Sequence, residues 1–255
     1  MSGHSKWSTI KHQKGATDAR RGAVFTKLSR DIVLAVRDGG GPDLVNNFRL
    51  RLTIAKAKGS NMPADNIARA IKRATGEGGE AGEHFEAVVY EGYGPGGGAI
   101  LLQAVTSNRN RTAAEVRFAF TRGGGSLGES GCVAWNFETK GVITLKMPDG
   151  QQGEELGLLA IDAGAEDVKL EDEILEIYTA PDQLQEVQRA LETHGVTSES
   201  AEISLVPKST VPLDTKAAEQ TLRLLDNLEE LADVQKAYTN ADFPPEVLQK
   251  YQETP

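Results

Sequence analysis

Three groups of residues have the types and spacing that bind phosphate. The first is a basic stretch at the N-terminus, where Lys, Arg and His residues surround a single Trp between His4 and Arg21. Cationic side chains neutralise phosphates, and an aromatic ring among them offers a stacking surface for an unpaired base. The alternative for Trp7 is packing against the protein's own helices.

The second group is the turn that contains Lys56, Lys58 and Asn61. The third lies at Ser107–Thr112, where Arg109 and Arg111 open a predicted helix. Cations at a helix N-terminus oppose the helix dipole, whereas two arginines beside exposed N–H groups form a receptive anion site. The alternative is that both arginines point into solvent.

These groups supply the candidate nucleic-acid-binding residues of the chain. They are His4, Lys6, Trp7, Lys11, His12, Lys14, Arg20, Arg21, Lys27, Lys56, Lys58, Asn61, Arg109, Asn110 and Arg111.

Motifs of enzymes are present only as fragments without their structural context. Gly92–Gly97 fits G-x-G-x-x-G, but a strand follows it where a dinucleotide fingerprint needs a helix. Gly124–Gly128 fits G-x-S-x-G, but Ser126 follows a helix and precedes a strand, the reverse of a nucleophile elbow. The four histidines show no metal-ligand spacing. We therefore expect no catalytic residue, metal or cofactor, with a hydrolase using Ser126 as a remote alternative.

Charge is divided unevenly along the 255 residues. The chain has a net charge of −9, yet residues 1–75 carry 15 Lys and Arg against 5 Asp and Glu, a net of +10. The remainder carries 13 and 32, a net of −19. This asymmetry predicts a basic binding module joined to acidic domains.

The basic module has a helical pattern. Apolar stripes that start at Phe25, Leu44 and Ile67 recur at spacings of three and four, and Pro63 suits the first position of the third helix. The Gly39–Gly41 cluster and Gly59 end the first two. We expect residues 1–80 to form a three-helix basic domain with an N-terminal arm.

Beyond Gly82 the pattern alternates between strands and helices. Strands are predicted near 85–90, 99–105 and 132–137, with a helix before the last. Residues 142–206 then follow the order β-α-β-β-α-β, which is typical of a ferredoxin-like domain. A later helix and strand (214–238) have no partner of their own. We therefore predict an α+β protein with a discontinuous α/β middle domain (81–137 and 207–243), an inserted ferredoxin-like domain (138–206) and a C-terminal tail (244–255).

Several motifs resemble one family. They are Gly3-His4-Ser5-Lys6-Trp7, Ile10-Lys11-His12, Asp18, Arg20-Arg21, Phe25-Thr26-Lys27-Leu28, Asn61-Met62-Pro63, Asn66-Ile67, Ala70-Ile71, Tyr90–Gly97, Asn110-Arg111-Thr112, Gly124-Gly125, Leu127-Gly128 and Gly131. The chain resembles the YebC/PmpR family nearly from end to end. The resemblance implies a helical basic domain followed by two α/β domains.

The resemblance also implies a non-enzymatic regulator of gene expression. Members are usually described as DNA-binding transcriptional regulators, while a mitochondrial relative activates translation and bacterial members have been linked to the ribosome. The partner therefore stays open between DNA and ribosomal or transfer RNA.

A cytoplasmic location is expected for the chain. No apolar run is long enough for a membrane span, and the single cysteine, Cys132, favours a reducing compartment. Because the family motif begins at Gly3, we expect no presequence before it.

Overall fold

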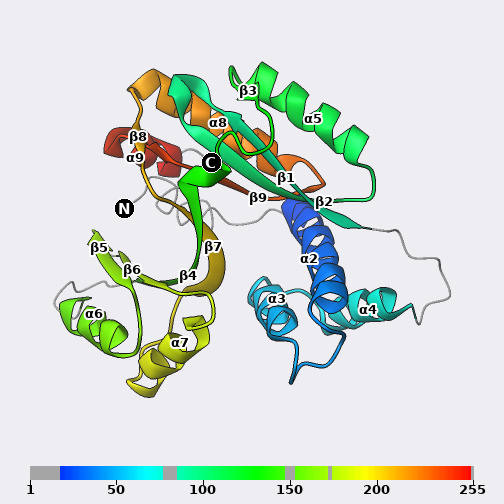
Figure 1. Cartoon of the computed structure of the whole chain (residues 1–255), viewed down its shortest axis with the longest axis vertical. Helices are drawn as coiled ribbons and strands as arrows, with labels where there is room; N and C mark the ends of the chain where they lie inside the picture. The colour runs from blue at the N-terminus through cyan, green and yellow to red at the C-terminus, as the bar shows by residue number, and fades with distance from the viewer. Residues whose placement is uncertain (1–17, 77–84, 147–152, 172–173, 254–255) are drawn as a thin grey trace.

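The computed structural model describes residues 18–76, 85–146, 153–171 and 174–253. Figure 1 shows three parts: helices α2–α4, a sheet covered by α5 and α8, and a second sheet covered by α6 and α7. The α+β class, with a three-helix part followed by two α/β units of which one is inserted in the other, is confirmed. The residue boundaries of the three domains stay a prediction.

The N-terminal part consists of α2 (Asp18–Asp38), α3 (Phe48–Gly59) and α4 (Ala64–Thr75). Their apolar stripes meet in one core. Its buried members are Leu28, Ile32, Ala35, Val36, Leu50, Ile54, Ala57, Met62, Ile67 and Ala70. Asn47 fixes the turn between α2 and α3: its Oδ1 accepts from Leu50 N at 2.9 Å and its Nδ2 donates to Ala35 O at 2.8 Å.

A second face of α2 is buried against the rest of the chain. Val33 and Leu34 pack with Phe85 and with Val105 of the middle sheet. Helix α2 is therefore shared between two cores, and this sets the basic part against the first sheet.

The middle unit is an antiparallel sheet of order β3-β1-β2-β9. Its strands are β1 (Glu86–Tyr93), β2 (Ala99–Thr106), the short β3 (Ser126–Leu127) and β9 (Val234–Thr239). Helices α5 (Arg109–Arg122) and α8 (Thr215–Glu230) cover one face. As expected, the Gly92–Gly97 motif lies at the β1–β2 hairpin. Gly92 and Tyr93 end β1, and the turn follows at Gly94–Gly98 with a 3₁₀ turn at Pro95–Gly97.

The inserted unit lies between β3 and α8. Its elements are β4 (Phe137–Lys146), α6 (Gly153–Asp162), β5 (Asp167–Glu171), β6 (Ile174–Thr179), α7 (Leu184–Thr193) and β7 (Ser200–Pro207). The sheet order β5-β6-β4-β7 with all neighbours antiparallel is that of a ferredoxin-like domain.

The strand expected at 132–137 does not form. Val133 N and Ala134 N instead donate to the buried Glu91 carboxylate at 2.8 Å each, and Gly131 N donates to it at 2.7 Å. Burial alone would raise the pKa of Glu91, but these three backbone bonds outweigh it and lower the pKa below its ordinary value. These backbone N–H groups therefore donate to a carboxylate and not to the carbonyl groups of a neighbouring strand.

The C-terminal segment also differs from the expectation of a tail. Residues Pro245–Glu253 form α9, and Val247 and Leu248 are buried in the core that contains α8. Two-residue strands β8 (Val211–Pro212) and β10 (Ala241–Asp242) pair in parallel just before α8 and α9 respectively.

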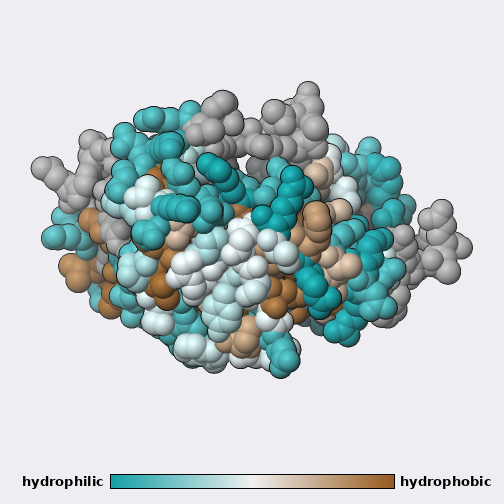
Figure 2. Space-filling model, turned by 90° about the horizontal axis from the view of Figure 1, so that it is seen from above, coloured by the Kyte–Doolittle hydropathy of each residue, from teal (hydrophilic) through white to brown (hydrophobic). Residues whose placement is uncertain are grey.

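The face of the molecule seen from above Figure 1 is mostly hydrophilic. Figure 2 shows hydrophobic residues on it in small separate areas rather than one continuous patch. Among the described residues, no helix has the length and apolar character to cross a membrane.

Candidate nucleic-acid interface

A buried carboxylate joins the basic part to the middle sheet. Asp233 follows α8 and precedes β9, and its side chain is only 2% exposed. Its Oδ2 accepts hydrogen bonds from Thr106 Oγ1 at 3.0 Å, Thr112 Oγ1 at 2.6 Å and Arg111 Nη2 at 2.7 Å. Strand β2 and the first turn of α5 are thereby tied to the segment between α8 and β9.

Two cations of α2 complete this arrangement. Arg30 Nη1 lies 2.9 Å from Asp233 Oδ1 and donates to Ala232 O at 2.6 Å. Lys27 Nζ donates to Glu229 O. Carbonyl groups at the end of a helix have no partner within the helix and carry partial negative charge, so cations are favourable there. Lys27 therefore docks α2 on the C-terminus of α8, and Arg30 binds the segment that follows this helix.

We call Lys27, Arg30, Thr106, Arg111, Thr112 and Asp233 the Asp233 joint. Burial alone would raise the pKa of Asp233. Hydrogen bonds from Thr112, Arg111 and Thr106, with the charge of Arg30, outweigh burial and lower this pKa below its ordinary value. The joint therefore holds an ionised carboxylate at neutral pH.

A second charged contact links the basic part to the inserted sheet. Lys56 Nζ of α3 lies 3.9 Å from Glu202 Oε2 on β7, and Glu202 also pairs with Lys236 of β9. Nearby, burial raises the pKa of Asp31, opposed by the positive charges of Lys56, Arg49 and Lys27.

A pocket opens between α2, α4 and the start of β1, with a volume of about 340 Å³. Its lining combines arginines, aromatic rings and small polar groups. The lining residues are Phe25, Thr26, Ser29, Arg30, Val33, Asn66, Arg69, Ala70, Arg73 and Phe85.

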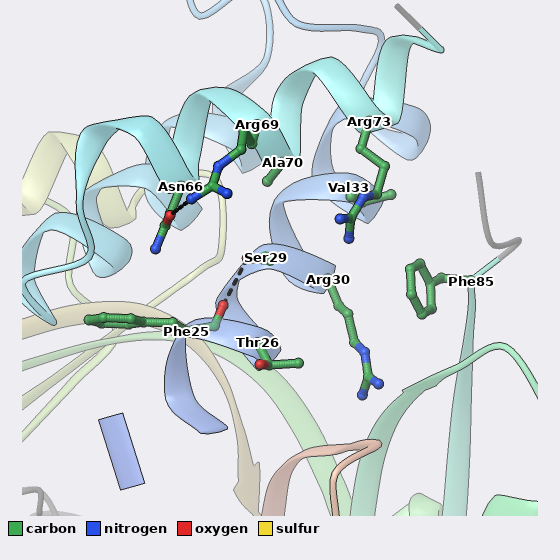
Figure 3. A pocket seen from close by; sticks show the side chains of 10 residues that line it. All are labelled: Phe25, Thr26, Ser29, Arg30, Val33, Asn66, Arg69, Ala70, Arg73 and Phe85. Carbon is green, nitrogen blue, oxygen red and sulfur yellow. Dashed lines mark hydrogen bonds between the residues drawn. The ribbon is translucent and has the colours of Figure 1, made fainter. Parts of the chain in front are cut away.

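The arginines of this pocket have different surroundings. Arg30 lies over the Phe85 ring, with its guanidinium carbon 5.4 Å from the ring centre, and points away from α4 toward the sheet (Figure 3). Arg69 and Arg73 are exposed on α4, and Arg73 points toward α2 and Phe85. In the described part of the chain neither Arg69 nor Arg73 forms an ion pair, and Arg69 bonds to Asn66 Oδ1.

Comparison with known proteins places this arrangement in a family. Residues 5–77 match the family model of the TACO1/YebC protein N-terminal domain, and residues 85–241 match that of the TACO1/YebC second and third domain. The chain belongs to the TACO1/YebC family.

Relatives in this family are similar over nearly their whole length. A "probable transcriptional regulatory protein" of Dehalococcoides mccartyi is 56% identical over 98% of this chain and 98% of its own. One of Moorella thermoacetica with the same description is 55% identical over 97% and 98%. The crystal structure of a conserved hypothetical protein from Aquifex aeolicus is 49% identical, with a TM-score of 0.83 over 94% of this chain and 98% of that one.

The structure of this TACO1/YebC chain separates the expected binding residues into several groups. His4, Lys6, Trp7, Lys11, His12 and Lys14 lie outside the described residues. Arg20 and Arg21 lie on the first turn of α2, and their side chains are likewise outside the described part of the chain.

Of the remaining expected cations, Lys27 and Arg111 belong to the Asp233 joint, and Lys56 pairs with Glu202. Arg111 is bonded to Asp233 while its side chain is still 49% exposed, and the anion site expected at Arg109 and Arg111 stays a prediction. Arg109 is 64% exposed, with Glu86 Oε2 at 3.7 Å.

The last three expected residues, Lys58, Asn61 and Asn110, are exposed as well. Asn61 has a φ of +57° in the turn between α3 and α4, a conformation that Asn tolerates better than most residues.

Sequence reasoning missed the polar face of α4. Asn66, Arg69 and Arg73 recur at spacings of three and four, so they share one face of the helix. This spacing can be recognised in the sequence. Nothing in the sequence indicates that Phe85 and Arg30 lie at the same pocket as this face of α4.

Replacing Asp233 with Asn should destabilise the protein by about 2–4 kcal/mol at neutral pH, because two arginines then face a neutral amide in a buried site. Because the pKa of Asp233 is lowered by folding, its contribution is full above the unfolded value near pH 4 and is lost as the pH falls through the folded pKa. Urea unfolding measured at neutral and at acidic pH should show that the two chains differ less in their free energy of unfolding at acidic pH. The exposed Glu230→Gln variant is the charge-matched control, and equal stability of both variants would contradict the joint.

Arg111 and Arg109 should contribute differently to the stability of the fold, although they are only two residues apart. Arg111→Gln should lower stability by about 1–2 kcal/mol because it removes a charged donor from Asp233. Arg109→Gln should change stability by less than about 0.5 kcal/mol because its pair with Glu86 is exposed. Thermal unfolding of the two variants gives the comparison, and equal melting temperatures would show that the Arg111 contact contributes nothing.

Proposed function

We propose that this chain regulates gene expression by binding nucleic acid through its N-terminal basic part. The proposal depends on the separation of charge, +10 in residues 1–75 against −19 in the remainder. This positive charge is only partly used within the fold. Lys27, Arg30 and Lys56 meet carbonyl or carboxylate oxygens, whereas Lys58, Arg69 and Arg73 are exposed without an ion pair among the described residues. Phosphate is the natural partner for such cations.

Transcriptional regulation through DNA is the first form of this proposal. The relatives at 55–56% identity are described as probable transcriptional regulatory proteins, and the likeness covers nearly the whole chain. The basic part would contact phosphates and so position the protein, while the acidic units would stay away from the polymer by like-charge repulsion.

Translation is the second form, with ribosomal or transfer RNA as the partner. The feature that favours it is the small size of the basic part beside two acidic units. Folded RNA brings many phosphates close to one compact surface, whereas a long duplex would also run past the acidic units.

The geometry does not favour the remote hydrolase alternative. Ser126 is the first residue of β3, after α5 rather than after a strand, which is the reverse of the order that a nucleophile elbow requires.

Lys6, Lys11 and Lys14 provide a test of phosphate binding. Changing all three to Ala should weaken binding and flatten the dependence of log affinity on log salt by about 0.7–0.9 for each phosphate that is no longer neutralised, measured between about 50 and 200 mM salt. The control replaces Arg189, Lys208 and Lys216, three exposed cations of the acidic units, with Ala. An unchanged affinity and slope in the first variant would remove these lysines from the interface.

Fractionation of cell lysate on a sucrose gradient distinguishes the two polymers. Migration with ribosomes that is abolished by RNase treatment is expected for a translation factor. Absence from ribosomes even after crosslinking, with recovery on DNA, is expected for a transcriptional regulator. Recovery on neither polymer would contradict the proposed function.

A further inference from the structure

We propose that the pocket between α2, α4 and Phe85 binds one unpaired nucleotide of a single-stranded nucleic acid, with its phosphate on Arg69 and Arg73 and its base against Phe25. This inference rests on the proposed function and names the part of the polymer that the basic module recognises.

The charge of the pocket points to an anion. Arg69 and Arg73 are four residues apart on the exposed face of α4, and like charges at this spacing destabilise a helix. The only acidic residue of α4 is Asp65 in its first turn, and in the described part of the chain no carboxylate pairs with either arginine. Guanidinium groups bind phosphate through two parallel hydrogen bonds, so a phosphodiester suits this pair.

Arg30 would not compete for this anion. Its guanidinium is already 2.9 Å from Asp233 Oδ1 and lies against the Phe85 ring. Figure 3 shows it pointing away from α4, so it forms the floor of the pocket rather than its anion clamp.

The remaining lining fits a planar base. Phe25 is half-buried: it packs against the three-helix core and also borders the pocket. Thr26 and Ser29 donate their hydroxyl protons to Gly22 O and Phe25 O, so their oxygens can still accept from a base edge. Asn66 Oδ1 accepts from Arg69, which leaves its Nδ2 as a donor at the wall. A volume of about 340 Å³ is at the lower end of small-molecule sites, the size expected for one nucleotide rather than a helix.

A duplex cannot place a base in such a pocket, because its bases are stacked and paired inside the helix. Extruding one costs unpairing energy, whereas a single strand presents its bases freely. The proposal therefore requires that the pocket distinguish single strands from duplexes.

The test compares two charge-matched variants of the full chain. Arg69→Gln/Arg73→Gln removes the proposed clamp, and Arg37→Gln/Lys72→Gln removes two exposed cations of the same helices outside the pocket. Affinity is measured for a short mixed-sequence strand, as RNA and as DNA, and for the corresponding duplex. Melting temperatures confirm that both variants are folded.

We expect the clamp variant to bind the single strand about ten-fold or more weakly, the value of at least one charge-assisted hydrogen bond, and the control to bind it less than about three-fold more weakly. The affinity for the duplex should change by the same factor in both variants. The single strand whose affinity falls further, RNA or DNA, identifies the source of the nucleotide.

A second measurement tests the base. Ultraviolet crosslinking of a strand that contains 5-iodouracil should attach it to Phe25, because this photochemistry favours an aromatic ring in contact with the base. Phe25→Leu should abolish that crosslink, and Phe48→Leu, at a half-buried ring outside the pocket, should leave it unchanged.

The outcomes separate the two proposals. If the natural chain binds neither strand nor duplex, the proposed function fails and this inference fails with it. Two results would overturn only the pocket inference, provided that the natural chain binds. In the first, the clamp and control variants lose the same affinity for the single strand. In the second, the clamp variant loses as much affinity for the duplex as for the single strand. A crosslink that maps outside the pocket also overturns it.

Discussion

The burial of one carboxylate sets the basic part against the middle unit. An ionised group removed from water is costly unless cations and hydrogen-bond donors surround it. Asp233 obtains them from segments far apart in the chain: Arg30 on α2, Thr106 on β2, and Arg111 and Thr112 on α5. The same helix α2 contacts the C-terminal carbonyl of Glu229 in α8 through Lys27, and the carbonyl of Ala232 just beyond α8 through Arg30. The basic part is therefore held against the acidic middle unit by its own charge, in addition to the apolar contact of Val33 and Leu34 with Phe85.

This use of cations divides the positive charge of the basic part. Residues that face the acidic units hold the fold together, and residues on the outer face of α4 have no such partner in the described structure. Net charge alone does not reveal this division, because it counts Arg30 and Arg73 alike. The two arginines differ in their partners. Arg30 lies 2.9 Å from Asp233, whereas Arg73 has no ion pair among the described residues.

Periodicity was enough to predict the helices of the basic part and the ferredoxin-like order of the inserted unit, because local stripes and glycine breaks carry that information. It failed at Cys132–Phe137, where a strand-like run is held by a carboxylate 42 residues away from Val133 in sequence. The site was harder to predict for the same reason. Arg111 was identified as an anion-binding residue, but its partner Asp233 is 122 residues away, and no local pattern reports such a contact.

The pocket and the Asp233 joint have one residue in common, Arg30. Phe85 lies just before β1, while Arg30 is on α2 and contacts both Phe85 and Asp233. The contacts proposed for the nucleotide, Arg69, Arg73 and Phe25, all lie on the three-helix part, so its binding depends on the docking of α2 only as far as it also touches Phe85. To that extent occupancy of the pocket favours the docked arrangement, and by reciprocity the intact joint raises the affinity of the pocket by the same factor. Since Arg69 and Arg73 are outside the joint, an anion held by them leaves the Arg30–Asp233 pair in place. Binding of the anion therefore needs no exchange of a cation between the pocket and the joint.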